Sequence, residues 1–268
     1  MRRGGNDIDI KKLMQTGEGI EELGEHLMDL DATFRFKCRK CGRCCKNQGM
    51  ILFTPNDLFK IAKKLGKPIQ AIINDCAEVY IGPQSKIPLV HLLMTGSKNA
   101  CPFLGTDSRC SIHDCKTVIC ALYPLGRVFV NQNPGAPISG TSETMVRYIL
   151  NGDCGSGKKT HTVREWLNDF GIPENDKFFL LWTRTITELG MLIRDLLEKG
   201  VPEKWLQPIW SAMFYKLYLD YDLNRDFMPQ FQQNTDKLLL DMPELCQVLL
   251  STTADTQKSD TGGAAGGL

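Results

Sequence analysis

Four cysteines stand close together near the start of the chain, in the run Cys38-x-x-Cys41-Gly42-x-Cys44-Cys45. A C-x-x-C step brings two sulfurs to the same side of a tight turn, and Gly42 relaxes the backbone there. The repeated step predicts that Cys38, Cys41 and Cys44 converge on one metal centre. Neighbouring side chains on extended backbone point to opposite faces, so Cys45 is expected to face a second centre.

Four further cysteines stand downstream in turn-rich sequence, with Gly or Pro within a few residues of most of them. Such loops let backbone N–H groups donate hydrogen bonds to the sulfurs of bound thiolates. Four plus four thiolates match two four-ligand sites, or one cluster and one zinc ion. The eight predicted ligands are Cys38, Cys41, Cys44, Cys45, Cys101, Cys110, Cys120 and Cys154.

The remaining three cysteines have a different setting. The total of eleven is odd, which excludes complete internal disulfide pairing. Cys76 and Cys246 fall on apolar helical stripes and are predicted to pack as small hydrophobic side chains. Cys115 lies between two predicted ligands and is an alternative to either of them. His113, close to the same thiols, is an alternative ligand or a histidine that lies beside them.

A set made only of thiolates suits two kinds of metal centre. Four thiolates around a divalent ion form the closed tetrahedral shell of structural zinc. Such a site contributes on the order of 10 kcal/mol to folding, enough to decide whether loop-rich sequence folds. The C-x2-C-x2-C spacing also supplies three ligands of an iron–sulfur cluster in bacterial ferredoxins. The spacing favours an iron–sulfur cluster of the 4Fe-4S type, and zinc stays open.

Charge and hydropathy predict the partners of the protein and the cellular compartment in which it is found. The 32 basic and 31 acidic residues nearly cancel, which argues against a nucleic-acid partner. The longest apolar stretch, Ile87 to Met94, is far shorter than a membrane span, so no membrane association is predicted. The basic start, Met1 to Arg3, is followed by charges rather than by an apolar signal segment. We therefore predict a cytoplasmic protein, whose thiols stay reduced and available for metal.

Helix and strand signals divide the chain into four parts. Thr54-Pro55-Asn56-Asp57 and the capping box Thr162 to Glu165 begin helices, and alternating residues predict strands at 89–94, 126–130 and 145–150. Helical patterns recur at 178–197, 205–221 and 231–250. The predicted class is α+β, an irregular, metal-stapled, cysteine-rich domain with short strands, followed by a mainly α-helical region. Its predicted parts are an N-terminal helical segment (1–33), a cysteine-cluster metal-binding domain (34–170), a helical region (171–250) and a disordered tail (251–268).

These residues resemble the YkgJ-type cysteine-cluster family. The resemblance lies in the four-cysteine run, the Thr-Pro-x-Asp helix start, Cys101-Pro-Phe-Leu, Cys110-x-Ile, Cys120-x-Leu-Tyr-Pro and the distal Cys154-Gly. It implies a CxxCxxCC domain, described as zinc- or iron-chelating or iron–sulfur. The family commonly has an aromatic residue and then Arg-Pro between the cysteines that match Cys110 and Cys120, whereas this chain has His113 and Lys116-Thr117 there. The helical region after residue 171 lies outside the resemblance.

Three functions remain open at this stage. The first is metal binding through the clustered cysteines, with a redox role. The second is a protein-modifying enzyme, because some flagellin lysine N-methylases contain a similar cysteine domain. The third is a zinc-stabilised interaction module. No catalytic residues can be assigned, and the aromatic residues of the C-terminal helices are predicted to form core unless an exposed face offers a groove for a protein partner or substrate.

Overall fold

The computed structural model describes residues 26–39, 41–47, 51–131, 144–150, 157 and 159–262. The helices expected before residue 26, together with Cys154, lie outside these residues. The chain forms two compact units. We call the first the hairpin unit (Met1–Arg39, Leu122–Ala136 and Ser142–Glu174) and the second the helical unit (Lys40–Ala121, Pro137–Thr141 and Asn175–Leu268).

The hairpin unit is built from two antiparallel strand pairs. Strand β1 (Thr33–Arg35) pairs with β7 (Thr160–Thr162), and β5 (Leu125–Asn131) pairs with β6 (Thr144–Leu150). Helix α6 (Val163–Asp169) begins at the predicted capping box, in which the Thr162 side chain accepts from the Glu165 N–H and the Glu165 carboxylate accepts from the Thr162 N–H.

Aromatic side chains fill the interior of the hairpin unit. Trp166 packs edge-on against Phe34, Phe36 and His161, with ring centroids 5.0–5.7 Å apart. Its indole N–H donates to the carbonyl of Leu122 at 3.0 Å. His161 is buried, and its Nε2 lies 3.1 Å from the Phe36 carbonyl oxygen, so this histidine belongs to the core.

The helical unit contains a three-stranded antiparallel sheet in the order β2–β4–β3. Strand β2 comes first in the sequence and is followed directly by α3. The N-cap Thr54 and the first helical residue Pro55 of α3 match the predicted helix start. Gly66, in the left-handed conformation with φ 63°, ends α3, and α4 follows directly after Pro68. The elements are β2 (Leu52–Phe53), α3 (Pro55–Leu65), α4 (Ile69–Cys76), β3 (Ala77–Ile81), β4 (Pro88–Leu92) and α5 (Val118–Leu122).

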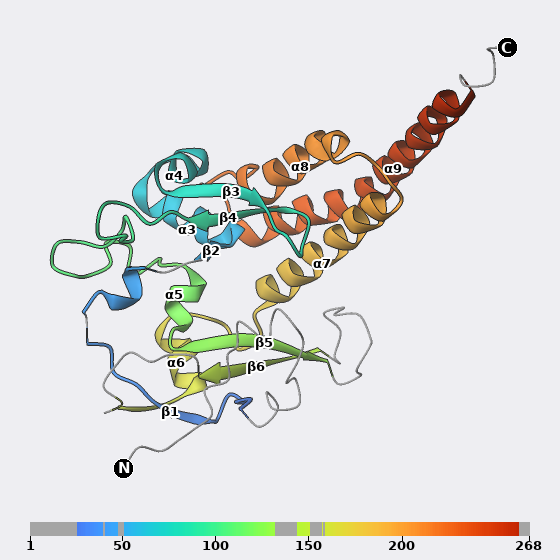
Figure 1. Cartoon of the computed structure of the whole chain (residues 1–268). Helices are drawn as coiled ribbons and strands as arrows, with labels where there is room; N and C mark the ends of the chain where they lie inside the picture. Colours follow the sequence, from blue (N-terminus) through green and yellow to red (C-terminus); the bar gives the residue numbers. More distant parts are fainter. Residues whose placement is uncertain are drawn as a thin grey trace. The chain divides into compact units, whose positions relative to one another are not determined.

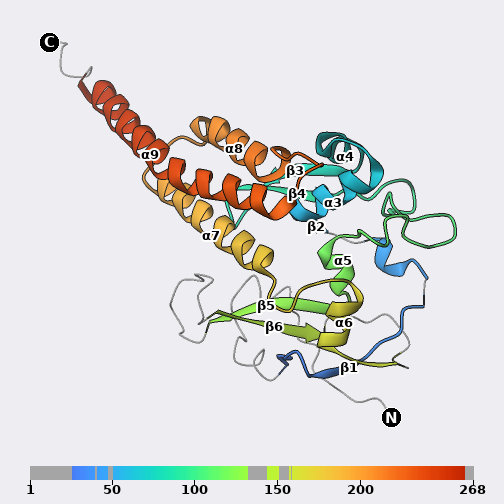
Figure 2. The same ribbon diagram turned by 180° about the vertical axis from the view of Figure 1, so that it is seen from behind.

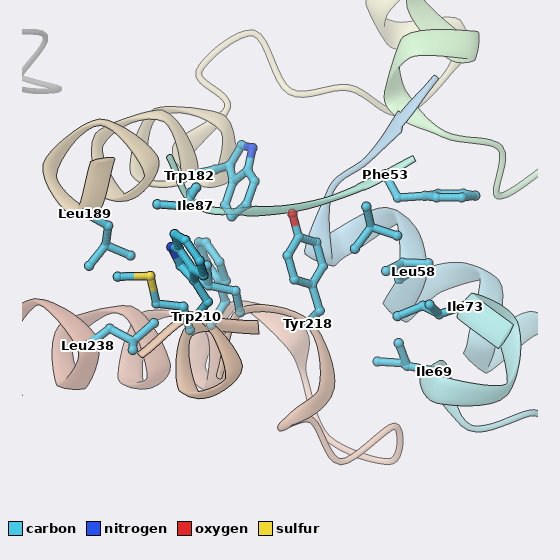
Figure 3. Close-up of a cluster of buried hydrophobic side chains, with 14 of the residues drawn as sticks. Phe53, Leu58, Ile69, Ile73, Ile87, Trp182, Leu189, Trp210, Tyr218 and Leu238 are labelled. Atoms are coloured by element: carbon cyan, nitrogen blue, oxygen red, sulfur yellow. The ribbon is translucent and has the colours of Figure 1, made fainter. Parts of the chain in front are cut away.

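The C-terminal helices complete this unit, and α7 and α9 lie side by side in both views (Figures 1 and 2). Their facing side chains are apolar, and Figure 3 shows Trp182, Leu189, Trp210 and Leu238 pointing into one shared cluster. Each such fully buried side chain contributes about 1.5–3 kcal/mol through removal from water. The elements are α7 (Lys177–Glu198), the 3-10 turn η2 (Glu203–Leu206), α8 (Gln207–Phe214), the π-helical η3 (Tyr215–Leu219) and α9 (Phe227–Gly262).

The α+β class with a helical C-terminal region is confirmed, and so are the three strands predicted between residues 89 and 150. Two local expectations differ. The apolar helical stripe that contains Cys76 is predicted by the sequence to continue to Tyr80, but Tyr80 lies on β3, because the helix ends at Cys76. Helix α9 continues to Gly262, beyond residue 250, since no Gly or Pro interrupts residues 251–261. Within the described ranges, no helix combines the length and apolar character needed to cross a bilayer.

Tyr218 makes the stability of the helical unit sensitive to alkaline pH. Burial raises the pKa of this phenol well above its ordinary value, so the folded protein keeps the proton that the unfolded chain releases near pH 10. Stability is therefore unaffected below about pH 10 and falls as the pH rises further, by up to ~1.4 kcal/mol per pH unit. We expect Tyr218→Phe to remove that part of the slope, measured by urea unfolding at a series of alkaline pH values. An unchanged slope would contradict this assignment.

Candidate metal centre

The Cys44–Cys45 pair lies on a helical turn and not on extended backbone. Gly42 has φ 65°, in the left-handed region that glycine adopts without strain, and it opens the 3-10 turn η1 (Arg43–Cys45). The Cys45 thiol donates a hydrogen bond to the Cys44 sulfur. The expectation that these two sulfurs face opposite ways is therefore wrong, because it assumed strand geometry. Adjacent side chains on a 3-10 turn are rotated by only a third of a turn, so both thiols can serve one centre.

Cys101 lies directly beside this turn. Its backbone N–H donates to the Cys45 carbonyl at 2.8 Å, and Figure 1 shows the short blue turn next to the green loop between β4 and α5. The Cys101 sulfur accepts hydrogen bonds from the backbone N–H groups of Phe103 and Leu104. Such N–H donors stabilise a thiolate, which is the form that binds metal.

Cys110 and Cys120 come from the same long loop and from the helix that ends it. An antiparallel bridge joins Cys110 to Leu104, and the Cys110 sulfur accepts from the backbone N–H of Ile112. Cys120 lies on α5, where its backbone N–H donates to the Thr117 hydroxyl oxygen at 3.3 Å. Both sulfurs are thereby directed by local backbone structure.

These five thiols are close enough to affect one another's ionisation. The hydrogen bond from Cys45 lowers the pKa of Cys44 to about 6, whereas the same bond and burial raise the pKa of Cys45 well above its ordinary value. Burial, helped by Cys101 and Cys110 and opposed by the Thr117 hydrogen bond and by Lys116, raises the pKa of Cys120 to about 11. Burial likewise raises the pKa values of Cys101 and Cys110.

The positive charge of Lys116 acts on several of these sulfurs. The positive charge of Lys116 favours the thiolate forms of Cys44, Cys110 and Cys120. A lysine in this place offsets part of the negative charge that a set of thiolates gathers on one ion. We call the five thiols Cys44, Cys45, Cys101, Cys110 and Cys120 the thiol cluster.

Comparison with known families adds an independent observation. Residues 37–137 match the family model CxxCxxCC, whose description is "Putative zinc- or iron-chelating domain". This segment is therefore similar to that domain family. No curated protein and no solved structure matches the chain. The matched segment contains seven of the eight predicted ligands, and Cys154 lies beyond its end.

The structure gathers only part of the predicted ligand set. The thiol cluster belongs to the helical unit, whereas Cys38 belongs to the hairpin unit, and Cys154 lies outside the described residues. Cys41 is exposed on the segment before η1. Among the residues that the structure describes, no three His, Cys, Asp or Glu side chains are already at metal-binding distance. Chelation by the thiol cluster thus requires its side chains to close in on the ion.

The other cysteines of the chain lie where packing explains them. Cys76 and Cys246 are buried in the core of the helical unit, as predicted, and the Cys76 thiol donates to the Ile72 carbonyl at 3.1 Å. Cys115 is half-buried, and burial raises the pKa of its thiol, with contributions from Asp114 and Cys110. His113 is exposed. Cys115 therefore lies near Cys110 of the thiol cluster and is not counted among its members.

Sequence reasoning missed the residues that hold Cys120 in place. Thr117 is the residue before α5, and its hydroxyl accepts from the Cys120 N–H, which is the hydrogen bond of an N-cap. A Thr three residues before a cysteine is compatible with an N-cap. The helix that it begins is only five residues long, however, so no periodic apolar pattern predicts a helix there. Asp57, recognised as a helix-start residue, also accepts from the Val118 N–H at 2.9 Å. That second role needs a contact across 61 residues of sequence, which no local pattern reveals.

Proposed function

We propose that the protein binds an iron–sulfur cluster through the thiol cluster of its CxxCxxCC domain. The observation that carries this proposal is that Cys101 donates its backbone N–H to the Cys45 carbonyl of η1 at 2.8 Å, while the thiols of the cluster affect one another's ionisation. The donor set fits such a group, because it consists of sulfurs alone and two of them accept backbone N–H bonds. The C-x2-C-x2-C spacing favours a cluster over the zinc ion that the same thiolates could bind.

The chain's own residues would do three things at this centre. Thiolates drawn from the thiol cluster bind the metal, backbone N–H groups of Phe103, Leu104 and Ile112 hold the sulfurs, and Lys116 offsets their charge. When bound, an iron–sulfur cluster supplies one-electron redox chemistry, whose potential depends on hydrogen bonds to sulfur and on burial. A redox role follows from this proposal.

Cys38, Cys41 and Cys154 remain proposed ligands, either for a second centre or in exchange with members of the thiol cluster. We also propose that the protein works in the cytoplasm. The support is the number of cysteines that stand close together in the sequence, since such a set binds metal only while its thiols are reduced. A reducing compartment keeps such neighbouring thiols available for metal.

Purification under anaerobic conditions tests the proposal directly. We expect a brown protein with visible absorption, containing iron and acid-labile sulfide in equal amounts, and bleaching when the cluster is reduced by dithionite. A colourless protein containing zinc would contradict the iron–sulfur proposal and assign the site to structural zinc. A protein that binds neither metal after reconstitution, with thiols that react freely, would overturn metal binding altogether.

A further inference from the structure

Thr117 stands at the point where the loop of the thiol cluster turns into α5. Its side chain is only 3% exposed. The hydroxyl oxygen accepts from the Cys120 N–H at 3.3 Å, and the hydroxyl also forms a hydrogen bond with the Cys120 sulfur. A hydroxyl has one donor and two acceptor positions, so it can donate to sulfur while it accepts from the backbone. Thr117 therefore holds both the backbone and the side chain of Cys120.

The start of α5 is also fixed from the opposite side. One oxygen of Asp57 accepts from the Val118 N–H at 2.9 Å, and the other accepts from the Thr54 N–H and hydroxyl at 2.9 and 2.8 Å. This carboxylate is 3% exposed and has three donors, so its position is set by the capping box of α3. Val118 is thus attached to the start of α3, which limits how far the preceding residue, Thr117, can move away from Cys120.

The neighbouring residue adds charge to the same arrangement. Lys116 favours the thiolate forms of Cys44, Cys110 and Cys120, and Thr117 hydrogen-bonds one of these sulfurs.

We propose that Thr117 is a positioning residue for the metal centre, which orients Cys120 toward the other thiols and donates a hydrogen bond to its sulfur once metal is bound. The inference rests on the proposed function, because it assigns Cys120 as a ligand. Partners that hydrogen-bond a metal ligand in this way change metal affinity about 10- to 100-fold when they are removed. A hydroxyl that served only to begin a five-residue helix would leave the metal–sulfur bond unchanged.

The test compares Thr117→Val with Thr117→Ser in the full chain, using cadmium as the probe metal. Valine keeps the shape of threonine but loses the hydroxyl, whereas serine keeps the hydroxyl. The matched control is Thr185→Val, since Thr185 is also fully buried and its hydroxyl donates to the Leu181 carbonyl at 2.8 Å, within α7. The measurements are cadmium affinity by chelator competition and the alkylation rate of Cys120, followed by mass spectrometry on the loaded protein.

We expect Thr117→Val to weaken cadmium binding about 10- to 100-fold and to expose Cys120 selectively to alkylation. Thr117→Ser and Thr185→Val should retain wild-type affinity and protection. The inference is overturned if Thr117→Val matches the wild type, or if Thr117→Ser loses metal equally. Failure of the wild-type protein to bind cadmium, zinc or iron would instead overturn the proposed function, so the two failures are distinguishable.

Discussion

Replacement of Cys101 by serine should remove most of the bound metal from the protein. Cys101 affects the ionisation of both Cys45 and Cys120, and its backbone is bonded to the η1 turn, so it lies at the middle of the thiol cluster. A serine hydroxyl is a poor ligand for iron or zinc compared with a thiolate. We expect metal per chain to fall about tenfold or more, and the free energy of unfolding by on the order of 5 kcal/mol. Elemental analysis and urea unfolding measure the two effects.

The matched control for this variant is Cys246→Ala. Cys246 is buried on α9 within the core of the helical unit, where burial and the nearby charge of Asp195 raise the pKa of its thiol. This change removes a sulfur without touching the thiol cluster, so the metal content should equal that of the wild type, with a stability loss of about 1 kcal/mol. Normal metal content in Cys101→Ser, or lost metal in Cys246→Ala, would contradict the assignment of the thiol cluster.

Local signals were sufficient to predict much of the fold. Thr54 and Pro55 fix the start of α3, and Thr162 with Glu165 fixes the start of α6, because a cap needs only residues within four positions of one another. The apolar stripes of α7 and α9 likewise report their burial, since the helical period places those residues on one face. The burial of Cys76 and Cys246 in the core could also be predicted, because both fall on apolar helical stripes.

The geometry of the thiol cluster could not be predicted in the same way. The relation of Cys44 to Cys45 depends on the left-handed conformation of Gly42, and glycine is compatible with several conformations. The sequence spacing of Cys101, Cys110 and Cys120 shows that they are candidate ligands, but their convergence depends on tertiary contacts. The bond from Val118 to Asp57 is such a contact, and so is that from Cys101 to Cys45.

Gly190 shows how closely helix α7 approaches the turn between β3 and β4. A Cβ atom at this position would lie 2.4 Å from the backbone oxygen of Ser85, well inside contact distance. The turn cannot easily withdraw, because Trp210 donates to the Lys86 carbonyl at 2.9 Å and Arg194 donates to the Gln84 carbonyl at 2.8 Å. Glycine is therefore required for this packing, although it is a poor helix former.

Gly190→Ala is accordingly expected to destabilise the protein. In an exposed helix the same change would stabilise by about 1 kcal/mol, since alanine has the higher helix propensity. Here the helix and the turn must separate to admit the methyl group, and such overpacking costs about 1–3 kcal/mol. Urea unfolding of the metal-loaded protein measures the change, and increased stability would show that the turn moves aside freely.

Met191→Ala is the control, because Met191 is the next residue on α7 and is 46% exposed, so its truncation should cost less than about 1 kcal/mol. Metal content should stay at the wild-type level in both variants, since both residues lie on α7, which contributes no member of the thiol cluster, and the stability loss in Gly190→Ala would then report the packing of α7 alone.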